Sequence, residues 1–451
     1  MQGVQAISPI QTLPLEIILE IFAFSASPLP NPRFSVDRIK DPPRFETTAM
    51  TISHVCSDWR SIAFSTPEVW SWMIVRSPTM RCAELVQYYL FRGGSSAGLH
   101  LSFYATSSNT LTPEALQDEA CSSTVIFDLW IDQIHRWRSI DFDFSIRRPP
   151  NRLLFIAPDD ICQLSSARLN LLYLLDPDQK RCHDTVYTSP TLKDIVWNCD
   201  LVRTYLPCPA LLGQLTSVYI IQTVKLDDFI KLLSSCSRLQ HLGIPVESAK
   251  GQDTVRPIVV TMHHLMTLHL HWWTTLDSSV QLDQIKAPNL LELEVGIPTE
   301  DPTALKRLLS RSRCNLRKLV LFAHRSVFEE HIVRCISTAS PHLASLNVFK
   351  LSGYFLSAKV TSLFLPSLVG GVMTIPFPQL IDLTLDRCYL VPDGHISNMV
   401  NARSRCGVPL WFFECRARYD GRKVAGLPMD SDYFASLKES GVRLFWRVEE
   451  L

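Results

Sequence analysis

One apolar pattern recurs along most of this 451-residue chain. Each copy has an apolar residue, two variable residues, a second apolar residue, one variable residue and a third apolar residue. From Leu169 to Leu343 successive copies begin 23 to 27 residues apart, and a last copy begins 37 residues later. The copies are Trp137/Ile140/Phe142, Leu169/Leu172/Leu174, Leu192/Ile195/Trp197, Leu215/Val218/Ile220, Leu239/Leu242/Ile244, Leu265/Leu268/Leu270, Leu290/Leu293/Val295, Leu316/Leu319/Leu321, Leu343/Leu346/Val348 and Leu380/Leu383/Leu385. Such a period predicts an array of similar units, because a single unit cannot bury its apolar face alone.

Each triplet is typical of a short strand, and helix-like segments at 227–235, 303–311 and 328–336 lie between triplets. The pattern and its period resemble those of leucine-rich repeats. The resemblance implies an irregular solenoid over residues 136–400, with a parallel concave sheet and convex helices. The long last step predicts a degenerate unit around Leu363, Leu365 and Leu368.

The solenoid hypothesis also predicts where a partner binds. Alternate side chains of a strand point to opposite faces, so residues between the apolar positions should face the concave surface. These residues mix aromatic rings, imidazoles and carboxylates without one dominant sign of charge, which favours a protein or peptide partner over a phosphate backbone. The predicted target-binding residues are Tyr173, Tyr219, His269, His271, Glu292, Glu294 and Asn347.

The first seventy-five residues have a different, helical pattern. Pro14 and Glu16 are typical of a helix start, and apolar residues follow on more than one face, so this helix needs a second partner. A proline-rich stretch from 28 to 43 predicts an irregular loop. A second amphipathic stretch, predicted to be one helix, runs from Ile52 to Ala63, before Pro67 and Trp70.

These motifs, in this order, resemble an F-box, specifically the F-box-like domain abundant in fungi. The matching pieces are Leu-Pro-x-Glu at 13–16, Val-Cys-x-x-Trp-Arg at 55–60 and Pro-x-x-Trp at 67–70, and the long proline-rich insertion departs from the family pattern. The resemblance implies binding to the Skp-type adaptor of a cullin–RING ubiquitin ligase. By motif position, the adaptor-binding residues would be Leu13, Pro14, Ile17, Val55, Cys56 and Trp59. The alternatives are an unrelated helical cap on the next domain and a purely structural role for Trp59.

Composition excludes several other classes. The 44 Lys and Arg balance the 44 Asp and Glu, so no net charge draws the chain to nucleic acid or an anionic membrane. Only 16 Gly are present, and no phosphate-binding P-loop motif occurs. The 13 Cys are scattered and form no Cys-x-x-Cys, and the N-terminus lacks a basic region before its apolar stretch. These features predict a cytoplasmic or nuclear protein without a signal peptide.

No catalytic constellation emerges from the sequence. Ser96 lies in a Gly-x-Ser-x-Gly pentapeptide, but helix precedes it and strand follows, the reverse of a nucleophile elbow. Cys182 and His183 are adjacent, which does not place a thiol and an imidazole in catalytic geometry. A His cluster at 263–271 could hold a metal only if three or four ligands converged. A hydrolase or metalloprotein is therefore the weakest hypothesis, and we expect neither an enzyme nor a cofactor.

Together these patterns predict an α/β chain in four parts. They are an all-α F-box-like module at 1–75, a junction at 76–135, a leucine-rich-repeat-like solenoid at 136–400 and a C-terminal cap at 401–451, with a strand at 442–446. The predicted function is a substrate-recruiting subunit of an SCF-type ubiquitin ligase, with a Skp-type adaptor, a cullin and an unknown target as partners. The alternative is a scaffold that binds proteins without delivering them for ubiquitination. Neither nucleic acid nor a membrane is an expected partner.

Overall fold

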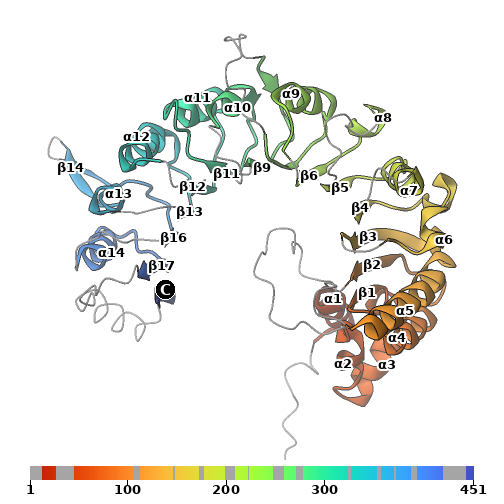
Figure 1. Ribbon diagram of the computed structural model, residues 1–451. Coiled ribbons are helices and arrows are strands. Elements are labelled where there is room, and N and C mark those ends of the chain that lie inside the picture. The colour runs from red at the N-terminus through yellow and green to blue at the C-terminus, as the bar shows by residue number, and fades with distance from the viewer. Residues whose placement is uncertain are drawn as a thin grey trace, which may run out of the picture. The chain divides into compact units, whose positions relative to one another are not determined.

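The structure is a computed structural model and forms two compact units, Met1–Leu211 (unit 1) and Leu212–Leu451 (unit 2). Each unit alternates strands with helices (Figure 1). The structure describes residues 13–26, 45–105, 112–145, 148–171, 177–198, 209–221, 223–246, 258–270, 278–323, 327–352, 357–369, 372–386, 394–419 and 443–450.

Unit 1 contains a sheet whose strands follow one another in chain order. Neighbouring strands from β1 to β5 are parallel. Its strands are β1 (Trp72–Arg76), β2 (Leu99–Tyr104), β3 (Trp137–Phe144), β4 (Ser166–Leu171) and β5 (Asp194–Asn198). Parallel neighbours require a crossover, and the helices between the strands supply it.

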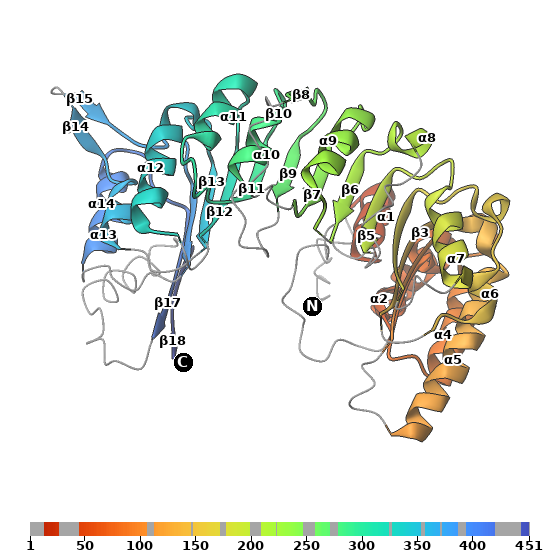
Figure 2. The same cartoon turned by 45° about the horizontal axis from the view of Figure 1, so that its top comes forward.

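The helices of unit 1 fall into an N-terminal group and a crossover group. The N-terminal group is α1 (Leu15–Ala26), α2 (Thr48–Ser53), α3 (Ser57–Ser65) and η2 (Pro67–Trp70). The crossover group is α4 (Met80–Arg92), α5 (Pro113–Ile131), η4 (Ile134–Arg136), α6 (Asn151–Leu154), η5 (Pro158–Ile161) and α7 (Pro177–Tyr187). Helices α4 to α7 lie along one face of the sheet (Figure 2).

Side-chain caps explain where the two longest crossover helices begin. The Thr79 hydroxyl accepts a hydrogen bond from the Cys82 N–H, and the Thr112 hydroxyl accepts one from the Ala115 N–H. Pro113 occupies the first turn of α5, where a missing N–H costs nothing. Aromatic rings of α5 and of the strands fill the space between them: Phe127 lies 4.9 Å from Phe103 and 5.0 Å from Phe142, between ring centroids.

Unit 2 repeats the same architecture with more strands. Its main sheet has the order β6-β7-β9-β11-β12-β13-β16-β17-β18, and neighbouring strands in it are all parallel. These strands are β6 (Ser217–Ile220), β7 (His241–Ile244), β9 (Thr267–Leu270), β11 (Glu292–Gly296), β12 (Lys318–Phe322), β13 (Val348–Ser352), β16 (Asp382–Asp386), β17 (Phe412–Tyr419) and β18 (Arg443–Glu450). The predicted strand at 442–446 corresponds to β18.

Helices and two short ribbons complete unit 2. The helices are α9 (Leu226–Ser235), α10 (Ser279–Asp283), α11 (Ala304–Ser312), α12 (Glu329–Ala339), η6 (Ser340–His342), α13 (Ala358–Ser362) and α14 (His395–Arg405), and α8 (Pro209–Leu212) spans the division between the units in the sequence. The ribbons pair β8 (Val260–Thr261) with β10 (Ile285–Lys286), and β14 (Ser367–Val369) with β15 (Val372–Thr374). Helices α9 to α14 lie along one face of the strands (Figure 1). We call the opposite face of each sheet its open face.

The predicted α/β class with a large parallel sheet is confirmed. Most apolar triplets occupy the core as predicted, for example Leu265, Leu268 and Leu270, which are all buried. The three predicted helices at 227–235, 303–311 and 328–336 correspond to α9, α11 and α12. The sheet also begins earlier than the sequence series, because β1 and β2 pair with each other and β2 pairs with β3. Residues 76–135 thus contain a strand of this sheet and two of its crossover helices.

Two triplets were placed in the wrong register. In the strand pairing, Ile140 and Phe142 align with Ala167 and Leu169, so the second triplet is Leu164/Ala167/Leu169. Leu319 and Leu321 align with Phe349 and Leu351, so the ninth triplet is Leu346/Phe349/Leu351. The degenerate unit expected near Leu363 adds no strand to the main sheet, because β13 pairs directly with β16.

The second amphipathic stretch is also not one helix. Helix α2 ends at Ser53 and α3 begins at Ser57, and the Cys56 sulfur accepts a hydrogen bond from the Trp59 N–H at 3.4 Å. Among the described residues, no helix combines the length and apolar character needed to cross a membrane.

Candidate functional site

The first candidate surface is the exposed apolar side of α1. Ile17, Ile21 and Phe24 recur at helical spacing and are 41%, 37% and 66% exposed. On the other side of the helix, Ile18 and Phe22 are buried, and the Phe22 ring lies 4.9 Å from the Trp59 ring. Leu15, at the start of the helix, is 52% exposed. Helix α1 therefore has two apolar sides, and its own unit covers only one of them.

The predicted adaptor-binding residues divide between this surface and the packing beneath it. Leu13, Pro14, Ile17 and Val55 are exposed, and Val55 is 58% exposed although it is a large apolar residue. We define Leu13, Ile17, Ile21, Phe24 and Val55 as the apolar surface of the N-terminal helices. Cys56 and Trp59 are half-buried: Cys56 caps α3 and Trp59 packs on Phe22. Their contacts are those of residues that hold α1 and α3 together.

The second candidate surface is the open face of unit 2. From β6 to β17, strand register places one residue of each strand of the main sheet in a central row along this face. The row is Tyr219, Gly243, His269, Glu294, Val320, Lys350, Thr384 and Glu414. Tyr219, His269 and Glu294 align in this row as predicted, and Glu292 lies two residues before Glu294 on the same face. His269 is buried, however, at 5% exposed, so it offers little surface to a partner.

The register shift changes one member of the predicted target-binding set. Asn347 precedes β13, and the residue that aligns with Val320 is Lys350. The sequence missed Lys350 because the apolar residues Leu343, Leu346, Val348, Phe349 and Leu351 allow two overlapping triplets. The other two predicted members, Tyr173 and His271, lie outside the described residues.

Charged groups on this face interact across neighbouring strands. The Lys318 ammonium lies 2.9 Å from a Glu292 carboxylate oxygen, and His269 Nδ1 lies 3.9 Å from Glu294 Oε2. Burial raises the pKa of the Glu294 carboxyl above its ordinary value, while the positive charges of Lys318 and Lys350 oppose that shift. Burial likewise raises the pKa of the Asp382 carboxyl. The face thus carries partly desolvated charges, which interact more strongly with a partner than fully hydrated ones.

Tyr219 and Gly243 make a close contact on this face that can be tested directly. A Cβ atom added to Gly243 would clash with Cδ2 of the Tyr219 ring, so the phenol ring covers the glycine backbone. We expect Gly243→Ala to displace the ring and lower the free energy of unfolding by about 1–3 kcal/mol, the usual cost of overpacking. Urea denaturation measures the loss. In a Tyr219→Ala background the same glycine substitution should be nearly neutral, and an undiminished cost there would contradict this contact.

The open face of unit 1 carries a polar network that the sequence did not reveal. The Tyr104 hydroxyl donates a 2.6 Å hydrogen bond to Asp141 Oδ2, and Arg168 Nε lies 3.5 Å from Asp141 Oδ1. The Arg76 guanidinium lies 5.6 Å from the centre of the Tyr104 ring. Sequence spacing could not reveal this network, because its members lie on four strands and the triplet containing Arg168 was misplaced. Its polar and charged groups interact chiefly with one another, so the network stabilises the sheet across its strands.

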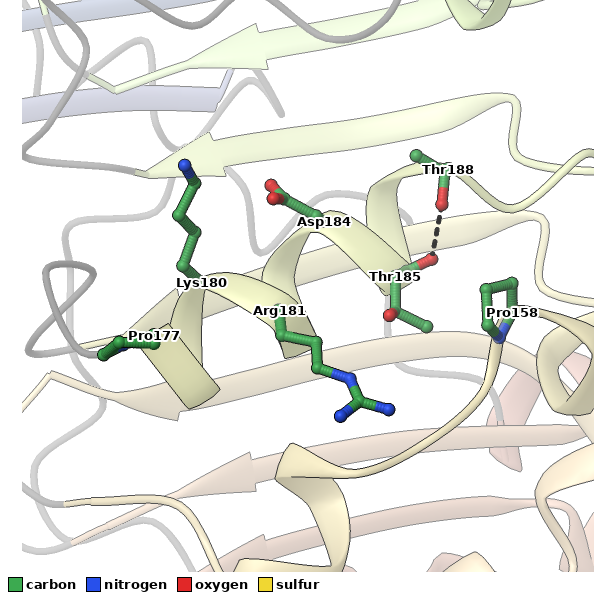
Figure 3. A pocket seen from close by; sticks show the side chains of 7 residues that line it. All are labelled: Pro158, Pro177, Lys180, Arg181, Asp184, Thr185 and Thr188. Carbon is green, nitrogen blue, oxygen red and sulfur yellow. Dashed lines mark hydrogen bonds between the residues drawn. The ribbon is translucent and has the colours of Figure 1, made fainter.

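A depression of about 400 Å³ lies on α7 beside Pro158 (Figure 3). Lys180 and Arg181 both line it, but their side chains point in different directions, with Asp184 on the same helix. The two cations therefore do not converge on one anion, and the depression is not a site for a phosphate group.

The remaining constellations do not assemble catalytic sites. Burial raises the pKa of the Cys182 thiol to about 12 and lowers that of His183 to about 4, so both are neutral at physiological pH. Ser96 is exposed in a turn between α4 and β2, the order expected from the sequence. His263 and His264 are exposed, and no group of three or more potential metal ligands occurs within the described part of the chain.

The described elements define a mixed α/β protein with parallel strands, helices on one face and a polar open face. Comparison with protein-family models finds no matching family, and comparison with curated protein sequences finds no match.

Proposed function

We propose that this chain is a substrate-recruiting subunit of a cullin–RING ubiquitin ligase. In this proposal the N-terminal helices are an F-box-like module that binds a Skp-type adaptor, and the strand–helix units form a leucine-rich-repeat-like solenoid whose open face binds a target protein. The chain itself makes and breaks no bond. It raises the effective concentration of a target lysine near the ubiquitin-conjugating enzyme.

The main support for this proposal is the exposed apolar surface of the N-terminal helices. The five large apolar residues of the apolar surface defined above, which lie in α1, just before it and between α2 and α3, are each at least one-third exposed. They lie in or beside the motifs that resemble an F-box. An apolar surface of this kind costs free energy in water and is typical of a protein-binding site. The two sides of α1 have different roles. Ile18 and Phe22 are buried and anchor the helix to the rest of unit 1, whereas Ile17 and Phe24 are exposed and available to a partner.

The test is binding of the full chain to a purified Skp-type adaptor. We expect the double variant Ile17→Asp/Val55→Asp to lose about 100-fold in affinity, since two desolvated apolar contacts of an interface core would each be replaced by a charge. Both positions are exposed, so the fold should tolerate the change, which circular dichroism checks. Phe91→Asp is the matched control, because Phe91 is 76% exposed but lies on α4, outside this surface.

Equal adaptor affinity of the double variant and the wild type would overturn the adaptor-binding role. Failure of wild type to bind would make the N-terminal helices a cap on the sheet. If wild type binds the adaptor, a reconstituted ligase distinguishes a substrate-recruiting subunit from a scaffold. Ubiquitin transfer to a protein bound at the open face supports a substrate-recruiting subunit. Binding of that protein without ubiquitin transfer supports a scaffold.

A further inference from the structure

The central row on the open face of unit 2 has a regular alternation of charge. Reading across β11, β12, β13, β16 and β17, strand register aligns Glu294, Val320, Lys350, Thr384 and Glu414. The sequence of charges is therefore negative, neutral, positive, neutral and negative. Neighbouring strands lie about 4.8 Å apart, so successive charges in this row are about 9.6 Å apart.

Lys350 is the centre of this alternation. It is half-buried, and its positive charge acts on the Glu294 and Asp382 carboxyls, although it forms no close ion pair among the described residues. Its aligned neighbours are Val320 and Thr384, which carry no charge. By contrast, Lys318 on the adjacent strand is already paired with Glu292. A half-buried ammonium that is not held in a close ion pair gains more from a partner's carboxylate than a closely paired or fully hydrated one does.

Carboxylates flank Lys350 on both sides and favour basic groups of a partner at those positions. Glu294 lies close to His269, and its side chain is 20% exposed. Glu414 occupies the equivalent position on β17, and Asp382 adds a further carboxylate on β16. Among the described side chains of these five strands, carboxylates outnumber ammonium groups, and they lie on both sides of Lys318 and Lys350. A purely acidic partner would be repelled at both ends, and a purely basic one would be repelled at the centre.

We propose that the open face of unit 2 recognises an extended segment of a partner protein with the charge pattern basic-x-x-acidic-x-x-basic. The acidic residue binds Lys350, and the two basic residues bind at Glu294 and Glu414. A polyproline II segment places every third side chain on one side at intervals of about 9.3 Å, which matches the spacing of the row. This inference rests on the target-binding half of the proposed function and is independent of adaptor binding.

The test uses the full chain and fluorescein-labelled peptides at low ionic strength. The matching probe is Arg-Pro-Pro-Glu-Pro-Pro-Arg, the comparison probe is Arg-Pro-Pro-Arg-Pro-Pro-Arg, and anisotropy measures their affinities. We expect wild type to bind the matching probe about 10-fold more tightly than the comparison probe. Lys350→Glu should bind the comparison probe more tightly, because the new carboxylate repels the central Glu of the matching probe and attracts the central Arg of the comparison probe. Lys359→Glu is the matched control: Lys359 lies on α13, is largely exposed and should leave the preference unchanged.

The outcomes separate the two proposals. Reversal in Lys350→Glu alone supports the recognition pattern. Equal affinity of wild type for both probes, or an unchanged preference in Lys350→Glu, overturns it. Adaptor binding of Lys350→Glu is measured in parallel, so loss of peptide preference with intact adaptor binding refutes only the recognition pattern. If wild type does not bind the adaptor, the adaptor-binding role is refuted, and the peptide measurements still test the recognition pattern independently.

Discussion

Replacing Trp70 with alanine should lower the free energy of unfolding of unit 1 by about 3–5 kcal/mol, the usual cost of truncating a buried aromatic residue. The Trp70 indole is fully buried, and its N–H donates a 2.7 Å hydrogen bond to the carbonyl of Ala63 in α3. Its ring also lies 5.1 Å from the Tyr89 ring of α4. Trp70 thus links the N-terminal helices to the first crossover helix, and its removal opens a cavity between them.

Chemical denaturation of the full chain measures this loss. Trp411→Ala is the matched control, because it also removes an indole, but Trp411 is 71% exposed and should change stability by less than about 0.5 kcal/mol. Trp70→Phe separates the two contributions: it keeps most of the buried ring and loses the hydrogen bond, so we expect a smaller cost of about 1–3 kcal/mol. Similar small losses for Trp70→Ala and Trp411→Ala would show that the N-terminal helices do not share a core with the sheet.

Substitution of Arg403 should have the largest effect in unit 2. Its side chain is fully buried on α14, and its guanidinium donates hydrogen bonds to the carbonyls of Phe364, Pro376 and Phe377. Burial lowers the pKa of Arg403 to about 10, which leaves the group charged at neutral pH. Arg403→Met fills similar space but leaves these carbonyls without donors, at about 1–3 kcal/mol for each buried group. Relief from burying a charge offsets part of that cost.

We therefore expect Arg403→Met to lower the free energy of unfolding by about 3 kcal/mol. Arg405→Met is the matched control on the same helix, because Arg405 is exposed and should be nearly neutral. Hydrogen exchange followed by mass spectrometry locates the effect: exchange should increase around 364–377, where the three carbonyls lie. An Arg403→Met protein as stable as wild type would mean that the carbonyls are satisfied without the guanidinium.

Much of this architecture follows from the spacing of apolar residues. The triplet period predicted the parallel strands and the positions of α9, α11 and α12, because each unit must bury the same strand positions against its neighbours. The spacing predicted the wrong strand register where apolar residues allowed more than one triplet. In β4 the small residue Ala167 occupies a position that larger residues hold elsewhere, and nearby leucines gave a false triplet.

The first strand was missed for a related reason. Trp70, Met73 and Val75 have the triplet spacing and are all fully buried, but none is leucine, and Trp70 also fits the helical Pro-x-x-Trp motif. On the candidate surfaces, the exposed residues of α1 could be predicted from its two apolar sides. The charge alternation around Lys350 could not, because it depends on which residues of separate strands align, and a shift of three residues replaces Lys350 with Asn347.

The position of β1 has a practical consequence for dividing the chain into fragments. The strand spans Trp72–Arg76 and pairs along its length with β2, so a cut after residue 75 would pass through it. A fragment starting at 76 would lose Trp70, Met73 and Val75 and would leave the backbone N–H and C=O groups of β2 unpaired on that side. Unpaired strand edges are templates for aggregation. Expression trials should therefore keep residues 45–105 together. A fragment lacking them should form insoluble oligomers even if every later strand and helix is intact.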